Sequence, residues 1–431
     1  MLNVCLLTCE LPPWHRGGIG TYVGTLAGAL HRLGHQVTVV GPGIHPQRVE
    51  RHGWGESIAL PIWTWATRGS RALALACARI GMARCPYLWR VPHTFAAGGL
   101  VAEAIQVRQF LKTHGSRFDI VEAPNYRGLL AFSQFLHGRA VVRLSTPGAR
   151  CGMGNLAGWM TWLEARTCDV ASAVISNSWA MRDVAIQTYA ESIRNVCVIP
   201  HGLDDAPQPG VVPQQDELVV SYIGRAEPRK GTDLLLRALP EALERDKSMR
   251  FRFVGCDLEA YVRANPQLAS SWERLRKEFG DRIELLGKVP DEHRDAMIAS
   301  SHWVIIPSRF ESFGLVAVEA MRVGTPVIAA DAGGLGEVAR AGECNVVFPP
   351  EDSTEITNAL SVVGEIGIRG AMLRRPLARQ TYEAHFTSEL MAKRSVAVYE
   401  SVVSGSESTD VVSLCTEALP RFPEPTSGGI A

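Results

Sequence analysis

The sequence predicts two successive α/β domains, each built on a doubly wound parallel sheet. The chain has 431 residues, which is long for one ordinary domain and suits two of about 200 residues each. Apolar segments typical of buried strands alternate with segments of helical spacing, and this order gives parallel sheets with right-handed crossovers. The alternation stops at residues 204–217, which are rich in Pro, Gln and Asp, and then restarts.

The first domain is expected to span residues 1–205. A buried strand at 2–8 is followed by a helix at 21–33, in which apolar residues recur every three to four positions. A second strand at 36–40 completes a β-loop-α-β unit. Later apolar segments extend the same sheet; they lie at 120–121, 141–144, 174–175 and 196–199.

The second domain is expected at 218–382, after a linker or hinge at 206–217. Residues 383–404 carry apolar side chains at helical spacing, which indicates a core-facing C-terminal helix. Residues 405–431 have the composition of a disordered tail. The strand at 218–223 leads into a helix at 232–244, and further strands are expected at 251–254, 283–286, 303–306, 327–330 and 345–347.

The charge of the chain argues against a dedicated nucleic-acid binder, because 44 basic residues balance 44 acidic ones. The balance is uneven along the chain. Residues 1–205 contain 19 Lys and Arg against 12 Asp and Glu, which is a net charge of +7 and leaves −7 for the rest. The N-terminal half is therefore the half expected to meet an anion or a membrane surface.

The cysteines and the N-terminus indicate a reducing, cytoplasmic location. Ten cysteines are scattered without a C-x-x-C pair, which is typical of buried thiols. The N-terminus lacks the charged region of a secretory signal. No apolar segment approaches the roughly 20 residues of a membrane-spanning helix. A peripheral contact at the inner membrane face stays open.

A glycine-rich turn follows the first strand. Gly17-Gly18-Ile19-Gly20 precedes a helix, where close backbone approach and free N–H groups suit a phosphate. The alternative is an ordinary tight turn. The turn is not a G-x-G-x-x-G motif, and no acidic residue ends the strand at 36–40, so a dinucleotide oxidoreductase is disfavoured.

A basic loop follows the first strand of the second domain. Arg225 and Lys230 lie at the carboxyl end of that strand, where two cations can grip a diphosphate. A solvated basic loop is the alternative, but this loop opens a helix at Thr232.

Two glutamates, Glu311 and Glu319, follow the strand at 303–306. Glu311 lies in a turn, whereas Glu319 lies within an apolar helical stretch, where a carboxylate is costly without a partner. Eight positions separate them by roughly 9–12 Å along a helix axis and about 80° around it. Two contacts along one elongated ligand explain this spacing better than an acid/base pair, for which about 5–9.5 Å is usual. Two unrelated surface glutamates are the alternative.

This pattern resembles the E-x7-E signature of retaining glycosyltransferases of family 4. The resemblance implies the GT-B fold, in which two Rossmann-like domains face each other across a cleft and a C-terminal helix crosses back to the first domain. It extends over most of the chain, through the glycine-rich turn and through Glu122-Ala123-Pro124, Ser176-Asn177-Ser178, Pro200-His201-Gly202-Leu203-Asp204, Gly224-Arg225 with Lys230-Gly231, and Gly333-Gly334 with Glu337.

The resemblance also implies a nucleotide sugar donor, held mainly by the second domain. Arg225 and Lys230 would bind the donor diphosphate, Glu319 the ribose hydroxyls, and Glu311 would lie near the transferred sugar. Arg225, Lys230 and Glu311 would be the catalytic residues. Backbone N–H groups would also face the phosphates, from Phe313, Gly314 and Leu315 and from Gly18 and Gly20.

No cofactor beyond the nucleotide sugar is implied. The sequence has no D-x-D motif, so a metal-independent reaction is expected. The resemblance further implies retention of the anomeric configuration. The acceptor would be a hydroxyl of a glycan, a lipid-linked sugar or a small metabolite, and the first domain would bind it.

One position departs from the family pattern. Many relatives have a histidine after the strand that corresponds to 141–144, whereas this chain has Ser145. A serine hydroxyl can donate a hydrogen bond to a sugar but cannot act as a general base near neutral pH. Ser145 and Arg143 are the candidate residues on the acceptor side.

A basic segment lies within residues 63–95, with no acidic residue between Glu56 and Glu103. It either rests on anionic lipid or receives a phosphate-bearing acceptor, or it is a helix packed on the first domain with solvated arginines. Two other functions stay open. One is a GT-B relative with epimerase or phosphorylase chemistry, and the other is a catalytically silent binding or scaffold protein.

Overall fold

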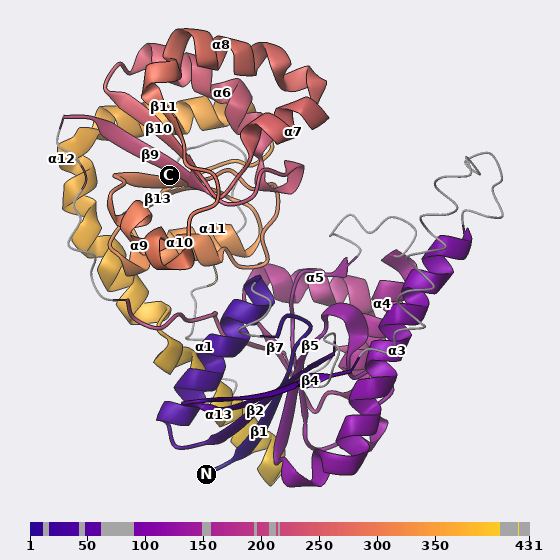
Figure 1. Ribbon diagram of the computed structural model, residues 1–431. Helices are drawn as coiled ribbons and strands as arrows, with labels where there is room; N and C mark the ends of the chain where they lie inside the picture. The colour runs from indigo at the N-terminus through magenta and orange to yellow at the C-terminus, as the bar shows by residue number, and fades with distance from the viewer. Residues whose placement is uncertain are drawn as a thin grey trace. The chain divides into compact units, whose positions relative to one another are not determined.

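The computed structural model describes residues 1–11, 17–42, 48–61, 90–148, 157–193, 196–206, 213, 216–405 and 421. Two compact units are present (Figure 1). The N-terminal unit is Met1–Gly202 together with the segment that begins at Ser388, and the second unit is Leu203–Thr387.

The N-terminal unit is built on an eight-stranded sheet. Its strand order is β3-β4-β2-β1-β5-β6-β7-β8, and every neighbouring pair is parallel except β3 with β4. The strands are β1 Asn3–Leu7, β2 Gln36–Pro42, β3 Arg48–His52, β4 Gly55–Leu60, β5 Ile120–Pro124, β6 Ala140–Arg143, β7 Ala173–Ser176 and β8 Val196–Val198.

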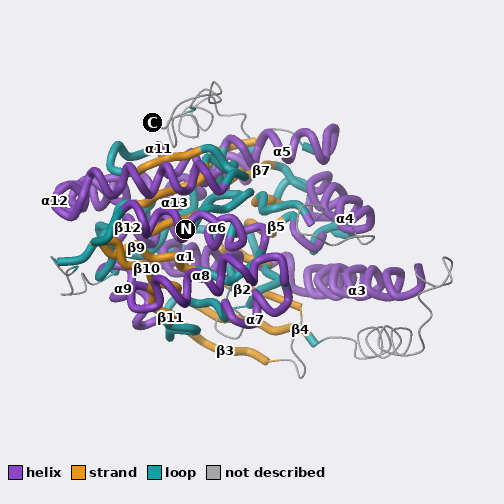
Figure 2. Tube along the Cα trace, turned by 90° about the horizontal axis from the view of Figure 1, so that it is seen from above, coloured by secondary structure: helices purple, strands orange, loops and turns teal. Residues whose placement is uncertain are grey.

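Helices cover both faces of this sheet. One face packs on α1 and α13 through Val23, Leu26 and Tyr399, and the other packs on α3 and α5 through Leu111 and Met181. The spacing of apolar residues in α1 explains why it forms a helix with one buried side. Figure 2 shows α3 as a long helix of this unit. The helices are α1 Gly18–Arg32, α3 Arg90–His114, α4 Ala157–Val170, α5 Trp179–Tyr189 and α13 Ser388–Ser404.

The second unit is built on a six-stranded, fully parallel sheet with the order β11-β10-β9-β12-β13-β14. In Figure 1, α6, α7 and α8 lie on one face and α9, α10 and α11 on the other. The strands are β9 Leu218–Ile223, β10 Met249–Val254, β11 Ile283–Leu285, β12 Trp303–Ile306, β13 Val327–Ala330 and β14 Val346–Phe348. The helices are α6 Thr232–Arg245, α7 Leu258–Ala264, α8 Ala269–Phe279, α9 Asp291–Ala299, α10 Leu315–Arg322, α11 Gly334–Arg340 and α12 Ser353–His385.

Two doubly wound domains are therefore confirmed, and strands β9, β12 and β13 have the predicted bounds. Strands β3 and β4 were not predicted from the sequence. Their residues include Arg48, Glu50, Arg51 and Glu56, which hide the alternation that identifies a strand. Strand β3 lies at the sheet edge, where polar side chains face water.

The prediction of one C-terminal helix at 383–404 is wrong at its start. Helix α12 ends at His385 and α13 begins only at Ser388. The two residues between them pair with the segment before the linker, since Phe386 O accepts from Leu203 N at 2.9 Å and Thr387 forms a β-bridge with Leu203. Backbone pairing thus ends the helix, and α13 belongs to the N-terminal unit.

Some expectations lie outside the described residues. These are most of the linker at 206–217, nearly all of the tail at 405–431, and residues 63–89 of the basic segment. Among the described helices, none is long and apolar enough to cross a membrane.

Candidate functional site

The candidate site lies at the carboxyl ends of β9 and β12. These strands are neighbours although they are not consecutive, because the chain runs outward from β9 to β10 and β11 and then returns to β12 on the other side. Such a reversal of strand order opens a crevice at the carboxyl end of an open α/β sheet, where ligands bind. The loops that follow these two strands carry the predicted site residues.

A glycine brings the two loops into backbone contact. Gly231 has φ 69°, and a Cβ there would lie 1.8 Å from the carbonyl oxygen of Pro307. Only glycine fits this left-handed conformation and close approach without strain. Arg309 adds a backbone hydrogen bond to Arg229 O at 2.9 Å and pairs with both carboxylate oxygens of Asp233 at 2.7 and 2.8 Å. The loop after β9 is therefore held firmly against the loop after β12.

Glu311 is the centre of a charge cluster at this junction. Its carboxylate accepts from Lys230 Nζ, from Arg229 Nη1 at 3.3 Å and from Ser308 Oγ at 3.2 Å. The Glu311 side chain is 12% exposed. Burial by itself raises the pKa of this carboxyl, but Lys230 and Arg229 more than offset that and hold the pKa below its ordinary value. The cluster is therefore an ionised carboxylate between two cations.

A second carboxylate, Glu227, links the cluster to Arg225. Glu227 Oε1 lies 3.2 Å from Arg229 Nη2 and 3.4 Å from Arg225 Nη2. The Arg225 side chain is 79% exposed. The structure thus brings Lys230 and Glu311 together, whereas Arg225 extends into solvent beside them. Arg229, Ser308 and Glu227 also belong to the cluster, although their sequence context did not predict it.

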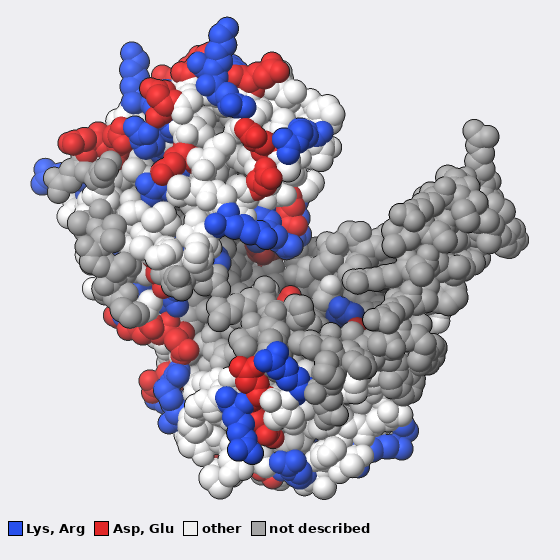
Figure 3. Space-filling view, in the orientation of Figure 1, with Lys and Arg blue, Asp and Glu red and all other residues white. Residues whose placement is uncertain are grey.

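Exposed ion pairs elsewhere on the second unit differ from this cluster. In Figure 3, basic and acidic side chains are interspersed over the visible face of that unit. Pairs such as Arg274 with Glu278 are exposed on both sides, and pairs of this kind contribute little to stability. The Glu311 cluster is distinguished by its burial and by its place beyond the strand ends.

Glu319 lies in α10 as predicted, and its partner is Arg294 of α9. Helix α10 begins after Gly314, which has φ 100°, and no described side chain caps its first turn or places a carboxylate there. The positive end of the helix dipole is therefore available to an anion. Phe313 is buried in the core and Leu315 is partly buried, so these residues can offer only their backbone.

The glycine-rich turn of the N-terminal unit meets a carboxylate. Gly18 begins α1, and the N–H of Gly20 donates to Glu10 Oε2 at 2.8 Å. A Cβ at Gly17 would lie 2.3 Å from Glu10 Oε1, so a larger residue there would displace this flexible carboxylate. An acidic side chain thus takes the Gly20 N–H, one of the two donors expected to face a phosphate, while Gly18 begins the helix.

Arg143 lies in a buried ion pair that the sequence analysis did not foresee. Its side chain is 0% exposed, and it donates to both oxygens of Glu122 at 2.8 and 3.2 Å. It also donates to Ser395 of α13 at 2.8 Å, while Tyr399 of α13 donates to Glu122 at 2.6 Å. The guanidinium is fully buried and paired through Nε and Nη2, while its Nη1 has no hydrogen-bond partner among the described residues, so we assign Arg143 to the attachment of α13.

Ser145 is the end of a buried hydrogen-bond chain. Asn125 Oδ1 accepts from Ser145 N at 2.7 Å and from Ser145 Oγ at 3.0 Å, while Asn125 Nδ2 donates to Tyr189 Oη at 3.0 Å. Tyr189 in turn donates to Glu164 at 2.7 Å, and Gly148 N donates to the same carboxylate at 3.1 Å. The Ser145 proton is used by Asn125, so the hydroxyl offers lone pairs outward.

Glu164 makes the stability of the N-terminal unit depend on pH. Burial raises its pKa from 4.5 to about 7, while hydrogen bonds from Tyr189 and Gly148 lower it. The folded state therefore keeps a proton that the unfolded state has lost, and stability falls as pH rises from 4.5 to 7. We expect this fall to amount to about 3 kcal/mol.

The measurement is urea unfolding of the wild type and Glu164→Gln at pH 5 and pH 8. The wild type should lose about 2–3 kcal/mol more than the variant between these pH values, because the amide does not titrate. Identical pH dependence in both proteins would show that Glu164 is ionised across the whole range.

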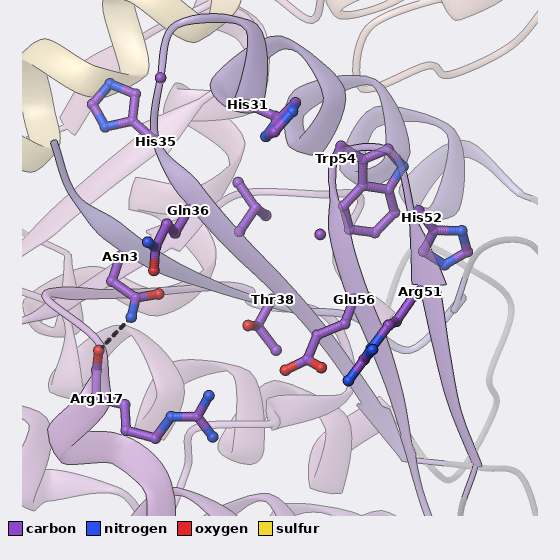
Figure 4. A pocket seen from close by; sticks show the side chains of 13 residues that line it. Asn3, His31, His35, Gln36, Thr38, Arg51, His52, Trp54, Glu56 and Arg117 are labelled. Atoms are coloured by element: carbon purple, nitrogen blue, oxygen red, sulfur yellow. Dashed lines mark hydrogen bonds between the residues drawn. The ribbon is translucent and has the colours of Figure 1, made fainter.

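A surface pocket of the N-terminal unit lies at the amino ends of β1 and β2, away from the carboxyl ends of the strands. Asn3 and Gln36, which begin β1 and β2, lie on one side of it, and His52 stacks on Trp54 on the other with ring centroids 4.5 Å apart (Figure 4). Arg117 O accepts from Asn3 Nδ2 at 2.8 Å. Because ligands of such sheets bind beyond the carboxyl ends, we do not assign a substrate to this pocket.

Comparison with known proteins identifies the family. Residues 16–206 match the family described as Glycosyltransferase Family 4, and residues 217–363 match the one described as Glycosyl transferases group 1. Together the two matches cover more than three quarters of the chain. The chain belongs to glycosyltransferase family 4.

Relatives of this family 4 glycosyltransferase differ in their named activities. Glycogen synthase of Mycobacterium tuberculosis is 24% identical over 94% of this chain and 96% of its own. Phosphatidyl-myo-inositol mannosyltransferase of Mycobacterium leprae is 28% identical over 78% of this chain and 100% of its own.

A solved structure supports the fold. HepE of Anabaena, in complex with UDP and glucose, superposes with a TM-score of 0.64 at 19% identity, covering 93% of this chain and 100% of its own. The predicted GT-B fold, with Rossmann-like domains and a C-terminal helix that returns to the first, is confirmed.

Proposed function

We propose that this glycosyltransferase is a retaining enzyme that moves a hexose from a nucleotide diphosphate sugar to a hydroxyl group. The observation that carries the proposal is the partly buried cluster of Lys230, Arg229 and Glu311 at the crevice of the second sheet. HepE, which has the same fold, was solved with UDP and glucose, and this supports a nucleoside diphosphate as the leaving group.

The cluster suits the charge that develops during transfer. As the bond between the sugar C1 and the diphosphate oxygen breaks, negative charge gathers on the departing nucleotide. Lys230, with Arg229 and Arg225 beside it, and the uncapped start of α10 are cations and dipoles already in place to stabilise that charge. The new bond forms between C1 and the acceptor oxygen on the same face, and the acceptor proton passes to a phosphate oxygen of the departing nucleotide.

Lys230 and Glu311 have separate roles in this scheme. Lys230 reaches the diphosphate, while Glu311 holds the Lys230 ammonium in position and lies nearest the transferred sugar. Glu319 would accept from the ribose hydroxyls. No metal and no cofactor other than the nucleotide sugar is part of the proposal.

The acceptor is proposed to be a glycan, a lipid-linked sugar or a small hydroxylated metabolite bound by the N-terminal unit. Relatives named glycogen synthase and phosphatidyl-myo-inositol mannosyltransferase support carbohydrate and lipid-linked acceptors respectively. Ser145 lies at the carboxyl end of β6 and presents its hydroxyl lone pairs, so we propose that it accepts a hydrogen bond from a substrate hydroxyl.

Nucleotide binding is the first test. Thermal unfolding is measured with UDP, GDP, ADP and TDP at one common concentration, and a nucleotide present at about 100 times its dissociation constant stabilises by about 2.7 kcal/mol. We expect a rise of roughly 5–11 °C in Tm with one base. Glu319→Ala should lose this shift because the ribose contact is removed. No shift with any nucleotide would favour a catalytically silent scaffold over the enzyme.

A further inference from the structure

Helices α9 and α10 of the second unit are joined by two ion pairs. Arg294 of α9 donates from Nη2 to Glu319 Oε2 of α10. Nearby, Arg322 of α10 donates from Nη2 to Asp295 Oδ1 of α9 at 2.6 Å. In the first pair the arginine belongs to α9, and in the second it belongs to α10. The second pair is therefore a control for effects that come only from joining the two helices.

The docking of α9 on α10 does not depend on Arg294. Ile298 and Ala299 of α9 are buried in the core that contains Ala317 and Val318 of α10. Thr325 Oγ1 also donates to the carbonyl of Ile298 at 3.0 Å. This packing and the Arg322 pair hold the two helices together. The Arg294 pair is therefore not needed for docking and can orient the Glu319 carboxylate.

The Arg294 guanidinium is only partly used. Its Nε is buried and has no hydrogen-bond partner among the described residues. Guanidinium and carboxylate groups commonly meet through two parallel bonds, and here the fork makes one bond to Glu319. A desolvated donor without a partner is costly, and a bound group that completes the site is one physical explanation for it.

We propose that Arg294 is a positioning residue that makes the nucleotide site select ribose over 2′-deoxyribose. Arg294 holds the Glu319 carboxylate in one orientation, in which its oxygens accept from both ribose hydroxyls of the donor nucleotide. When the nucleotide binds, Nε closes the second bond to Glu319. This inference rests on the proposed function, because it takes a nucleotide ribose as the partner of Glu319.

The physical basis of selection is the orientation of the acceptor. Glu319 is 13% exposed, so an oxygen deprived of its 2′-hydroxyl donor is poorly rehydrated. A site built to receive a hydroxyl rejects an analogue that lacks it, because the polar group is left unpaired. Without Arg294, the Glu319 carboxylate can turn toward water when the 2′-hydroxyl is missing. The penalty for binding the 2′-deoxy nucleotide is then smaller, so the preference for ribose falls.

The test compares Kd values for the ribonucleotide that binds best among UDP, GDP and ADP with those for its 2′-deoxy analogue, by calorimetry. We expect the wild type to bind the ribonucleotide about 10–100-fold more tightly. In Arg294→Ala the ratio should fall below about 3, as in Glu319→Ala, and in the double variant it should fall no further. Arg294→Lys should keep part of the ratio, because one cation remains next to the carboxylate.

Asp295→Asn is the matched control, since it weakens the other pair between the same helices. It should leave the ratio as in the wild type. An unchanged ratio in Arg294→Ala, or an equal loss in Asp295→Asn, would overturn the positioning role while nucleotide binding itself stands. A wild type that binds none of the nucleotides would overturn the proposed function and this inference together.

Discussion

Lys230→Ala is expected to abolish detectable transfer, with kcat lowered by at least about 10³-fold. The Lys230 ammonium is the cation in direct contact with Glu311, and it lies at the crevice where the leaving diphosphate is proposed to bind. Its removal takes away a charge that matters most when negative charge develops on the nucleotide, so kcat should fall more than the affinity for the nucleotide.

The measurement is the rate at which nucleoside diphosphate is released from a nucleotide sugar. The nucleotide is the one that stabilises the wild type against unfolding. Arg229 lies 3.3 Å from Glu311, so the carboxylate should keep a cation in the variant and the fold should be retained. Lys277→Ala, which removes an exposed lysine of α8 in the same unit, is the matched control and should keep full activity. Full activity in Lys230→Ala would remove this account of the leaving group.

Arg143→Ala is expected to cost about 3–5 kcal/mol of stability. The substitution leaves the Glu122 carboxylate buried with Tyr399 as its remaining side-chain donor among the described residues. It also removes the bond from Arg143 to Ser395, so α13 loses part of its attachment to the sheet. The Tm of the N-terminal unit should fall by roughly 6–20 °C.

Two further variants test whether the loss of stability comes from the buried ion pair. Arg143→Met combined with Glu122→Leu removes both charges and should recover most of the lost stability. Arg139→Ala removes an arginine just before the same strand, with two weak 3.4 Å bonds to backbone carbonyls, and should cost less than about 1 kcal/mol. A cost that small for Arg143→Ala would contradict the role of the buried pair.

Much of the fold was predictable because its signals are local. Strand β9 and strand β12 are short apolar segments bounded by polar or glycine-containing loops, and their bounds agree with the prediction. Strand β4 was missed because its first residues are Gly55 and Glu56, so its apolar part is too short to identify alone. The helix break at 386–387 was missed because it depends on pairing with Leu203, far away in the chain.

The candidate site was predictable in part. Glu311, Lys230 and the place of Glu319 in a helix follow from motifs that lie within a few residues of a strand end. Arg229 and Arg294 were missed as partners because the sequence does not say which cation faces which carboxylate. Arg229 and Glu311 are 82 residues apart, and Arg294 and Glu319 are 25 apart, so only the packing of the loops and helices pairs them.

The sequence by itself determined the two doubly wound domains and the residues with the right chemistry at the strand ends, because hydrophobic periodicity and turn composition act over a few neighbouring residues. Only the tertiary structure decided what each charged side chain does. Arg143 and Arg225 both follow the pattern of a basic residue near a strand end, yet one is fully buried against Glu122 and the other is largely exposed. The two guanidinium groups differ in how far they are removed from water. That depends on which distant segments pack over each of them, so it cannot be predicted from the neighbouring residues in the sequence.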